Sequence, residues 1–261
     1  QSTWVDFSAA TQLNTTVTED DNGELVLAPF STLGVYTSSV HHASMPFVAV
    51  GSYWQSMAPT GTGMTLSIRA SDDGVSWTAW QEIPPMDAER EEARIEYGEL
   101  IFVTGTKLQY RITFSSKSPP AAPRLDSLTL VMINSLDGPT AEQSLAVSVS
   151  PAGQPVIISR AAWGADEKMM TWPPEYRDVR KFVIHHTVTL NNDLDPAATM
   201  RAIYYYHGIT RGWGDIGYNY VIDSHGRIYE GRYGGEGVVG GHALEFNWGS
   251  IGVALLGNYE Q

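Results

Sequence analysis

The feature of this sequence that most limits its fold is a change of pattern about halfway along the chain. Residues 1–134 contain short runs that alternate apolar and polar residues, and turn residues separate these runs. From residue 157 onward, strand-like runs alternate with a helix-like run. Residues 135–156, which lie between, are rich in proline, glycine and small polar residues, as a linker is. The sequence therefore predicts two domains joined by a linker.

The first predicted domain is an all-β sandwich. Its clearest strand-like runs, with a period of two residues, are residues 24–27, 64–69, 109–114 and 128–133. Regular short strands separated by turns are typical of a sandwich, in which two sheets pack their apolar faces together.

A hairpin is predicted over residues 68–80. Asp73 and Gly74 form its turn, because glycine readily adopts the positive φ that a tight turn needs. Trp77 and Trp80 are three residues apart, so on a regular strand they face opposite sides. We expect one in the core and the other either in a structural role or as a stacking platform for a sugar. The segment resembles hairpins of extracellular carbohydrate-active β-sandwiches, so this domain is a candidate cell-wall or glycan-binding module.

Composition excludes several classes of function. The 261 residues include no cysteine, which rules out disulfides and thiolate ligands within this chain. The net charge of −13 disfavours nucleic acid as a partner, because phosphates are repelled. No apolar run is long enough for a transmembrane helix. The first residue, Gln1, is typical of a trimmed chain from which a targeting segment has been removed, and this favours export.

The second domain contains a strand-like run over residues 181–187 that ends in two imidazoles and a hydroxyl. We expect this strand to be buried, with His185 and His186 on opposite faces. Asp195 followed by proline predicts the start of an amphipathic helix, and Gly208 its end. Other strand-like runs are residues 217–223, 227–230 and 250–257. Strands interleaved with a helix indicate an α/β domain.

Motifs in this second domain follow one another in a distinctive order. They are residues 183–187 (VIHHT), 206–207 (YH), 212–220 (GWGDIGYNY), 226–232 (GRIYEGR), 241–243 (GHA) and 250–258 (SIGVALLGN). On these motifs, residues 157 to 259 resemble the peptidoglycan recognition protein family, which shares its fold with type 2 N-acetylmuramoyl-L-alanine amidases. The resemblance implies a mixed central sheet with flanking helices.

The resemblance also implies an activity, the zinc-dependent hydrolysis of the amide between N-acetylmuramic acid and L-alanine of the stem peptide. A zinc ion in such a site polarises a carbonyl group and activates a bound water. By this resemblance, His185 is a zinc ligand. Tyr218 is the catalytic residue that assists the activated water or the oxyanion, because a phenol can both donate and accept a hydrogen bond.

Four residues are expected to bind substrate by the same resemblance, namely Thr187, His207, His242 and Asn258. His207 and His242 match positions that line the peptide-binding groove of the family, although packing roles are an alternative for both. Some amidases of this fold have a glutamate general base in the strand that covers residues 250–255. This chain has Ala254 there, so it fits the branch of the family that uses the tyrosine.

Two expected zinc ligands have no match before Gln261. In the family they are a histidine of a Gly-His motif and then a cysteine or aspartate, and they follow a further helix. Three explanations stay open, which are a truncated domain, a natural binder without zinc, and a rearranged set in which His242 replaces one ligand. A truncated domain would also expose apolar surface, which favours oligomers.

The sequence thus predicts three regions, a β-sandwich (1–134), a linker (135–156) and an apparently truncated amidase domain (157–261). The predicted function is that of a secreted or cell-envelope amidase that acts on peptidoglycan or muropeptides, with zinc as its cofactor in the full-length protein. The alternative is a non-catalytic peptidoglycan-binding protein.

Overall fold

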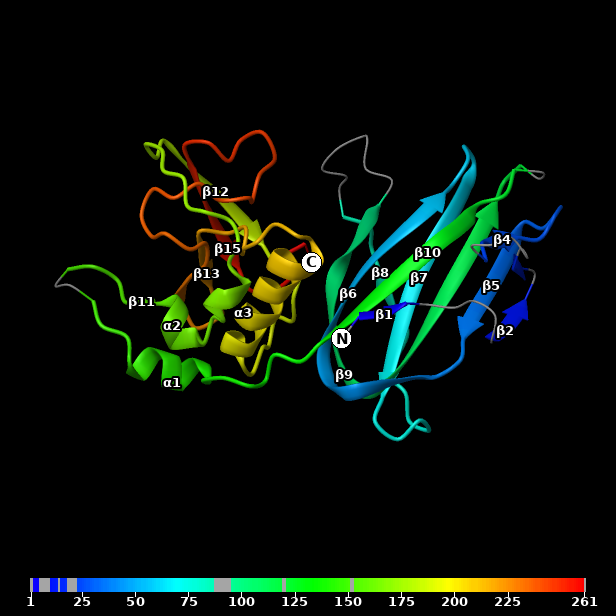
Figure 1. The fold of residues 1–261 in the computed structure, drawn as a ribbon, viewed down its shortest axis with the longest axis horizontal. Helices are drawn as coiled ribbons and strands as arrows, with labels where there is room; N and C mark the ends of the chain where they lie inside the picture. Colours follow the sequence, from blue (N-terminus) through cyan, green and yellow to red (C-terminus); the bar gives the residue numbers. More distant parts are fainter. Residues whose placement is uncertain are drawn as a thin grey trace. The chain divides into compact units, whose positions relative to one another are not determined.

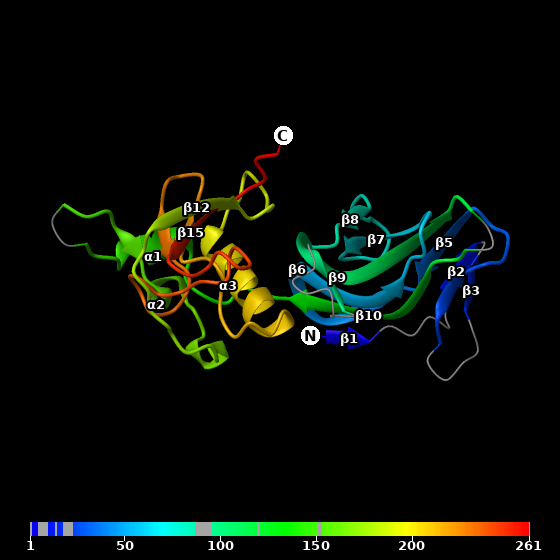
Figure 2. The ribbon, with the colours of Figure 1, turned by 90° about the horizontal axis from the view of Figure 1, so that it is seen from above.

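The computed structural model describes residues 2–4, 10–13, 15–17, 23–86, 95–118, 121–150 and 153–260. The chain divides into two compact units, Gln1–Asn134 and Ser135–Gln261 (Figure 1). The first unit contains only strands, and the second combines strands with helices, as Figure 2 shows from above. An all-β unit followed by an α/β unit is the predicted arrangement, and this prediction is confirmed.

The first unit contains ten strands among its described residues. They are β1 (Ser2–Trp4), β2 (Ala10–Leu13), β3 (Thr15–Val17), β4 (Leu25–Leu27), β5 (Leu33–Ser38), β6 (His41–Met57), β7 (Thr62–Ser71), β8 (Gln81–Ile83), β9 (Glu96–Ser116) and β10 (Arg124–Ile133). The longest strand, β9, pairs mainly with β6 through its first half and with β5 and β7 through its second half. The alternating inward side chains of these strands form one continuous apolar core.

The predicted hairpin turn is present, and its role is structural. Gly74 has a φ of 82°, and the Asp73 carboxylate accepts hydrogen bonds from the backbone N–H groups of Val75 and Ser76, both at 2.7 Å. These bonds hold the turn from within, as in an Asx-turn.

The prediction that one of the two tryptophans lies in the core was wrong. Trp77 and Trp80 are both half-buried, and both rings lie 4.7 Å from the guanidinium carbon of Arg69. Arg111 lies 4.0 Å from the Trp80 ring. Residues 77–80 are not in a strand, so the alternation of side chains that the prediction assumed does not apply.

The second unit has a five-stranded mixed sheet in the order β11-β14-β13-β15-β12. Its strands are β11 (Ile157–Ile158), β12 (Lys181–His186), β13 (Tyr220–Ile222), β14 (Ile228–Glu230) and β15 (Ser250–Leu255). Only β13 and β14 are antiparallel, as a hairpin. The other three pairings are parallel, including that of β12 with β15.

Helices pack beside this sheet. They are α1 (Ala141–Ala146), α2 (Arg160–Trp163), α3 (Pro196–Tyr205), the 3₁₀ turn η1 (Glu167–Met169) and the π-helical turn η2 (Tyr206–Thr210). As predicted, Asp195 caps α3 by accepting a hydrogen bond from the Ala198 N–H, and proline follows at the first helical position. The helix does not end at Gly208, because η2 extends it to Thr210.

The segment predicted as a linker contains a helix. Thr140 and Gln143 form a reciprocal capping box that begins α1, with Thr140 Oγ1 accepting from the Gln143 N–H and Gln143 Oε1 accepting from the Thr140 N–H. Residues 151–152 lie outside the described part of the chain.

Candidate functional site

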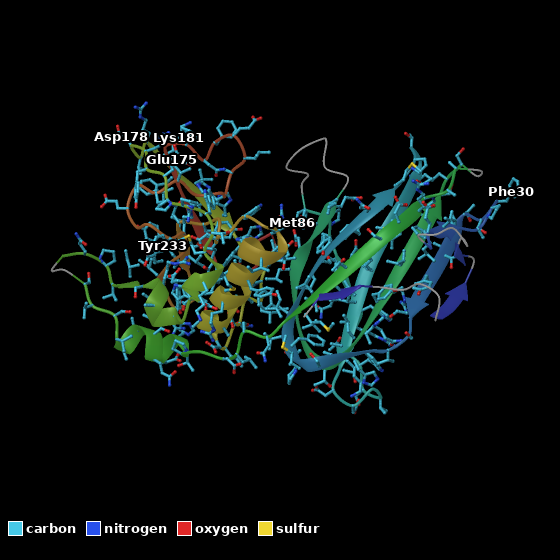
Figure 3. All side chains as sticks on the ribbon, viewed as in Figure 1. Phe30, Met86, Glu175, Asp178, Lys181 and Tyr233 are labelled. Carbon is cyan, nitrogen blue, oxygen red and sulfur yellow. The ribbon has the colours of Figure 1, made fainter. Side chains whose placement is uncertain are left out.

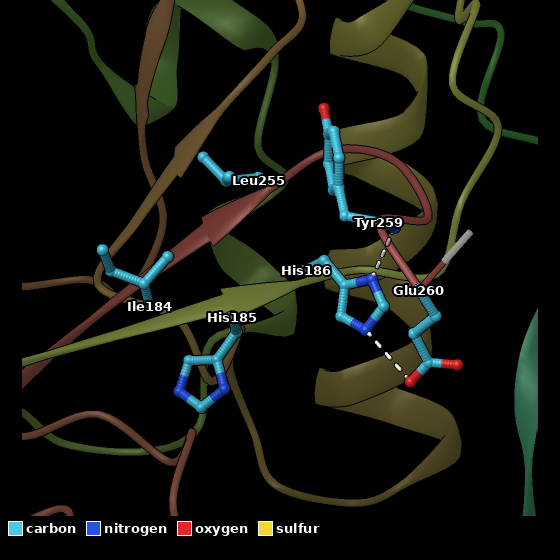
Figure 4. Close-up of a pocket in the computed structure, with 6 residues that line it drawn as sticks. All are labelled: Ile184, His185, His186, Leu255, Tyr259 and Glu260. Atoms are coloured by element: carbon cyan, nitrogen blue, oxygen red, sulfur yellow. Dashed lines mark hydrogen bonds and ion pairs between the residues drawn. The ribbon is translucent and has the colours of Figure 1, made fainter.

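The candidate site begins at the carboxyl end of β12. In the parallel register His185 lies opposite Ala254, and Val221 of β13 lies opposite the same alanine, so these residues share one face of the sheet. His186 lies opposite Leu255, one position further, and faces the other side. Figure 4 shows the two imidazoles pointing away from β12 in different directions. The predicted separation of the two histidines is confirmed.

The imidazole of His242 contacts that of His185. The Nε2 atom of His185 and the Nδ1 atom of His242 are 3.0 Å apart, a hydrogen-bonding distance. Gly252 makes this approach possible, because a Cβ atom at that position would lie 2.2 Å from the His242 ring. The Asn247 side chain holds the loop, since its Oδ1 accepts from the backbone N–H groups of His242 and Ala243.

Tyr218 lies between two imidazoles. Its ring centroid is 5.7 Å from that of His185 and 5.5 Å from that of His207. The His207 ring packs in turn on Trp213, at 4.6 Å between centroids, and its Nδ1 accepts a hydrogen bond from the Gly217 N–H. His207 is only 6 % exposed, so its contacts in this structure are with these protein groups.

Burial keeps these imidazoles neutral. It lowers the pKa of His207 to about 3, with a further contribution from the nearby charge of Arg211. It lowers the pKa of His242 to about 4, to which His185 adds. The pKa of His185 is lowered by burial first and by His186 second. Neutral imidazoles are the form that binds a metal ion or accepts a proton.

A buried carboxylate holds the loop that precedes Tyr218. Asp215 is fully buried and accepts hydrogen bonds from Arg160 Nη1 at 3.0 Å and Arg232 Nη1 at 2.7 Å. Its oxygens also accept from the backbone N–H groups of Ile216 and Tyr233, both at 2.8 Å. With four donors the carboxylate is fully satisfied, so it is a structural residue of the loop.

Arg232 connects this carboxylate to Tyr218. Its side chain donates to Asp215, and its backbone N–H donates to the Tyr218 carbonyl oxygen at 2.7 Å. Asn219 fixes the next residue, because its Oδ1 accepts from the Gly252 N–H and its Nδ2 donates to the Val238 carbonyl. The sequence did not single out Asn219 by itself, and its place in the GYNY motif was the only signal for it.

Thr187 and Asn258 lie just beyond the ends of β12 and β15. The Thr187 hydroxyl accepts from the Gly257 N–H at 3.2 Å and shares a hydrogen bond with Thr189. The Asn258 side chain accepts from the Glu260 N–H. These polar groups therefore hold the segment after β15, while the pair of His185 and His242 lies on the sheet face.

His185 and His186 both line a pocket at the carboxyl end of β12. The lining residues are Ile184, His185, His186, Leu255, Tyr259 and Glu260, as drawn in Figure 4. His186 Nδ1 accepts from the Tyr259 N–H at 3.0 Å, and its Nε2 lies 3.6 Å from a Glu260 carboxylate oxygen.

The prediction that β12 is buried was wrong. It is the edge strand of the sheet, and the side chains of Phe182 and Ile184 are each 73 % exposed on one face. Figure 3 shows Asp178 and Lys181 among the side chains that project outward near the start of this strand. The apolar run indicated burial, but here one face of β12 is open.

The described residues do not complete a zinc site. A catalytic zinc ion takes three protein ligands, and His185 has one imidazole, that of His242, at hydrogen-bonding distance. Within the described ranges, no group of three or more histidine, cysteine, aspartate or glutamate side chains is arranged to hold a metal ion. The neutral imidazole of His185 has the donor chemistry that zinc requires.

Two families match the two units. Residues 175–261 match the family described as N-acetylmuramoyl-L-alanine amidase, and residues 4–127 match the Rv3811 N-terminal galactose-binding domain-like family. The resemblance of the second unit to these amidases and to peptidoglycan recognition proteins is therefore confirmed, and the first unit is similar to domains of the galactose-binding type.

Individual relatives match the second unit. The N-acetylmuramoyl-L-alanine amidase of Homo sapiens is 39% identical over 116 residues, which are 41% of this chain and 19% of that protein. Peptidoglycan-recognition protein SC1a of Drosophila melanogaster is 36% identical over 106 residues, 40% of this chain and 55% of that protein. The chain thus spans about half of the insect protein and a fifth of the human one.

Among solved structures, wild-type Drosophila PGRP-LB shares 32% identity, with a TM-score of 0.36, over 40% of this chain and 62% of that one. Peptidoglycan recognition protein LE, solved with tracheal cytotoxin, shares 34% identity over the same fractions, with a TM-score of 0.37.

In the described part of this chain, none of the helices has the length and apolar content that crossing a bilayer requires.

Proposed function

We propose that this protein is an N-acetylmuramoyl-L-alanine amidase of the cell envelope or of the secreted fraction. Its substrate is peptidoglycan or a muropeptide, and the bond cleaved joins the lactyl group of N-acetylmuramic acid to L-alanine. The observation that carries the proposal is the meeting of His185, Tyr218 and His242 on one sheet face. They come from three distant segments within the part of the chain that is similar to amidases.

In this proposal Tyr218 is the catalytic residue. Hydrolysis of an amide places negative charge on the carbonyl oxygen, and a positioned phenol hydroxyl stabilises that charge by donating a hydrogen bond. The ring is half-buried between two imidazoles, so its orientation is restrained before substrate binds. This restraint reduces the cost of orienting the hydroxyl during the reaction.

His185 is proposed as a zinc ligand, and the zinc ion would supply the polarised carbonyl and the activated water. His242, which contacts His185, would orient its imidazole or line the groove. Thr187, His207 and Asn258 remain proposed substrate-binding positions. The ring of His207 is buried, so in this proposal it affects substrate through its contact with the Tyr218 ring.

The competing function is that of a peptidoglycan-binding protein without catalysis. The incomplete set of metal ligands around His185 within the described residues favours it. Both functions require a muropeptide to bind beside His185 and Tyr218, so binding alone does not separate them.

Release of free stem peptide from purified peptidoglycan, measured by mass spectrometry with the full chain, separates the two functions. The amidase releases peptide when zinc is supplied and stops when a chelator removes it. Tyr218→Phe keeps the ring and removes the hydroxyl, so release should fall by about 100-fold or more while muropeptide binding stays within about threefold. Binding with no release by the zinc-loaded chain would establish the binder.

A further inference from the structure

Both ring nitrogens of His242 have a partner within hydrogen-bonding distance. Its Nδ1 lies 3.0 Å from His185 Nε2, and its Nε2 lies 3.3 Å from the hydroxyl oxygen of Ser250. Ser250 is the first residue of β15 and is only 3 % exposed, so its side chain has a fixed environment. Ser250, His242 and His185 therefore form a continuous row of hydrogen-bonding groups, which we call the imidazole row.

The direction of the hydrogen bonds along the imidazole row is fixed at Ser250. Its hydroxyl carries one proton, and two backbone carbonyl oxygens lie within reach, that of Phe246 at 2.6 Å and that of Asn247 at 3.2 Å. A carbonyl oxygen only accepts. Two oxygens at 2.6 Å with no proton between them would repel each other, so the hydroxyl proton of Ser250 points towards Phe246. Only the lone pairs of the Ser250 hydroxyl then remain for His242.

This direction determines the tautomer of His242. Because the Ser250 oxygen accepts from Nε2, that nitrogen carries the proton of the ring. Burial lowers the pKa of His242 to about 4, so at neutral pH the ring holds a single proton. The other nitrogen, Nδ1, is therefore bare.

The tautomer of His242 determines that of His185 in turn. A bare Nδ1 only accepts, so the proton in the 3.0 Å hydrogen bond belongs to His185 Nε2. The neutral His185 ring then has its lone pair on Nδ1. This atom has no hydrogen-bond partner among the described residues, and it is not one of their buried unpaired atoms, so it is accessible. His185 also lines the pocket at the carboxyl end of β12.

We propose that Ser250 is a positioning residue, which sets the tautomers of His242 and His185 so that His185 presents the lone pair of Nδ1. A neutral histidine without fixed partners exchanges between two tautomers, and each nitrogen is then bare for only part of the time. The imidazole row removes this exchange. In the proposed amidase the lone pair would hold the zinc ion, and that use rests on the proposed function, whereas the tautomers do not depend on it.

The test is NMR of the metal-free full chain labelled with ¹⁵N-histidine, at pH 7.5. A ring nitrogen that carries a proton and one that is bare resonate at well-separated frequencies, so the spectrum reports the tautomer directly. His185→Gln and His242→Gln assign the signals, because each variant lacks its own pair. In the native chain, Nε2 of both residues should have the signal of a protonated nitrogen and Nδ1 that of a bare one. A native His242 with its proton on Nδ1 would overturn the proposal.

Two variants make the test specific to the Ser250 hydroxyl. Ser250→Ala removes the acceptor for His242 Nε2–H, so both His242 signals should move towards the average of the two tautomers. Ser250→Thr keeps a hydroxyl and should keep the native tautomers. Ser144→Ala is the matched control, because Ser144 is fully buried and its hydroxyl also donates to a backbone carbonyl, that of Thr140. The histidine signals should not move in this control.

A purely structural role for Ser250 predicts that the His242 tautomer stays the same in Ser250→Ala, and this result would also overturn the proposal. If Ser250→Ala does not fold, the native spectrum alone decides which nitrogen carries the proton. The metal-free spectra give their answer whether or not the chain releases stem peptide, so this test can fail without the amidase proposal failing, and the reverse holds too.

Discussion

At the scale of single residues, His207 links pH to stability. Burial lowers its folded pKa to about 3, whereas an unfolded histidine has a pKa of about 6.5. The unfolded chain therefore binds a proton that the folded chain does not. The free energy of unfolding must fall as the pH falls from about 6.5 towards 3.

The matched variant for this effect is His207→Asn, because an asparagine Oδ1 can accept from the Gly217 N–H in place of His207 Nδ1. Between pH 7 and pH 5, the native chain should lose about 2 kcal/mol more than the variant. Urea unfolding at a series of pH values measures this difference. Equal pH slopes in the two proteins would show that His207 titrates normally in the folded state.

Asp215 is the second residue whose substitution should strongly change the free energy of unfolding. Asp215→Asn leaves the buried guanidinium groups of Arg160 and Arg232 without their shared counter-charge, so we expect a loss of about 3–5 kcal/mol. Glu167→Gln also removes a partner of Arg160, but its side chain is 44% exposed, so its cost should stay below about 1 kcal/mol. Chemical denaturation of both variants makes the comparison. Similar losses in the two would mean that Asp215 is not the centre of this network.

At the scale of elements, the close approach of β15 to the His242 loop decides whether the two imidazoles meet. Gly252→Ala places a methyl group where the His242 ring lies, so we expect about 1–3 kcal/mol of destabilisation and the loss of the contact with His185. Gly208→Ala is the control, because its nearest neighbours are at 3.6 Å. Imidazole NMR signals report the contact. Unchanged signals in Gly252→Ala would argue against this packing.

The elements were predictable from the sequence where a local signal determines them. The cap at Asp195 and the turn at Asp73 and Gly74 are set by a few neighbouring residues, so the pattern identified both. The exposure of β12 was not predictable, because its place at the sheet edge depends on which strands pair, and an apolar run reads the same at an edge and in the centre.

In the candidate site, too, some features were predictable from the sequence and others depend on the tertiary fold. The family motifs were sufficient to single out His185, Tyr218 and His242. No sequence pattern gave the 3.0 Å contact of His185 with His242, because it depends on a loop that folds across Gly252.

At the scale of the whole molecule, the open face of β12 and the net charge of −13 have opposite effects on self-association. Apolar side chains on an exposed edge favour self-association, while like charge disfavours it. We expect association that increases with protein concentration and with salt, because salt screens the repulsion.

Sedimentation velocity tests this expectation with Ile184→Glu, which adds a charge at a side chain that is 73 % exposed. This variant should remain monomeric at concentrations where the native chain associates. Val75→Glu, at an 83 % exposed position in the first unit, should behave as the native chain does. Association that is the same in all three proteins would place the contact elsewhere.

The pairing of β12 with β15 also has a kinetic consequence. The two imidazoles that meet at 3.0 Å are separated by 57 residues of chain, and the strands that hold them are parallel. Parallel pairing between distant segments forms slowly, because the loop must close before any contact repays its entropy. During synthesis from the amino end, β12 emerges well before β15, and until then its edge and its apolar side chains have no partner strand. Slow refolding of the second unit should therefore originate at the strand that carries His185.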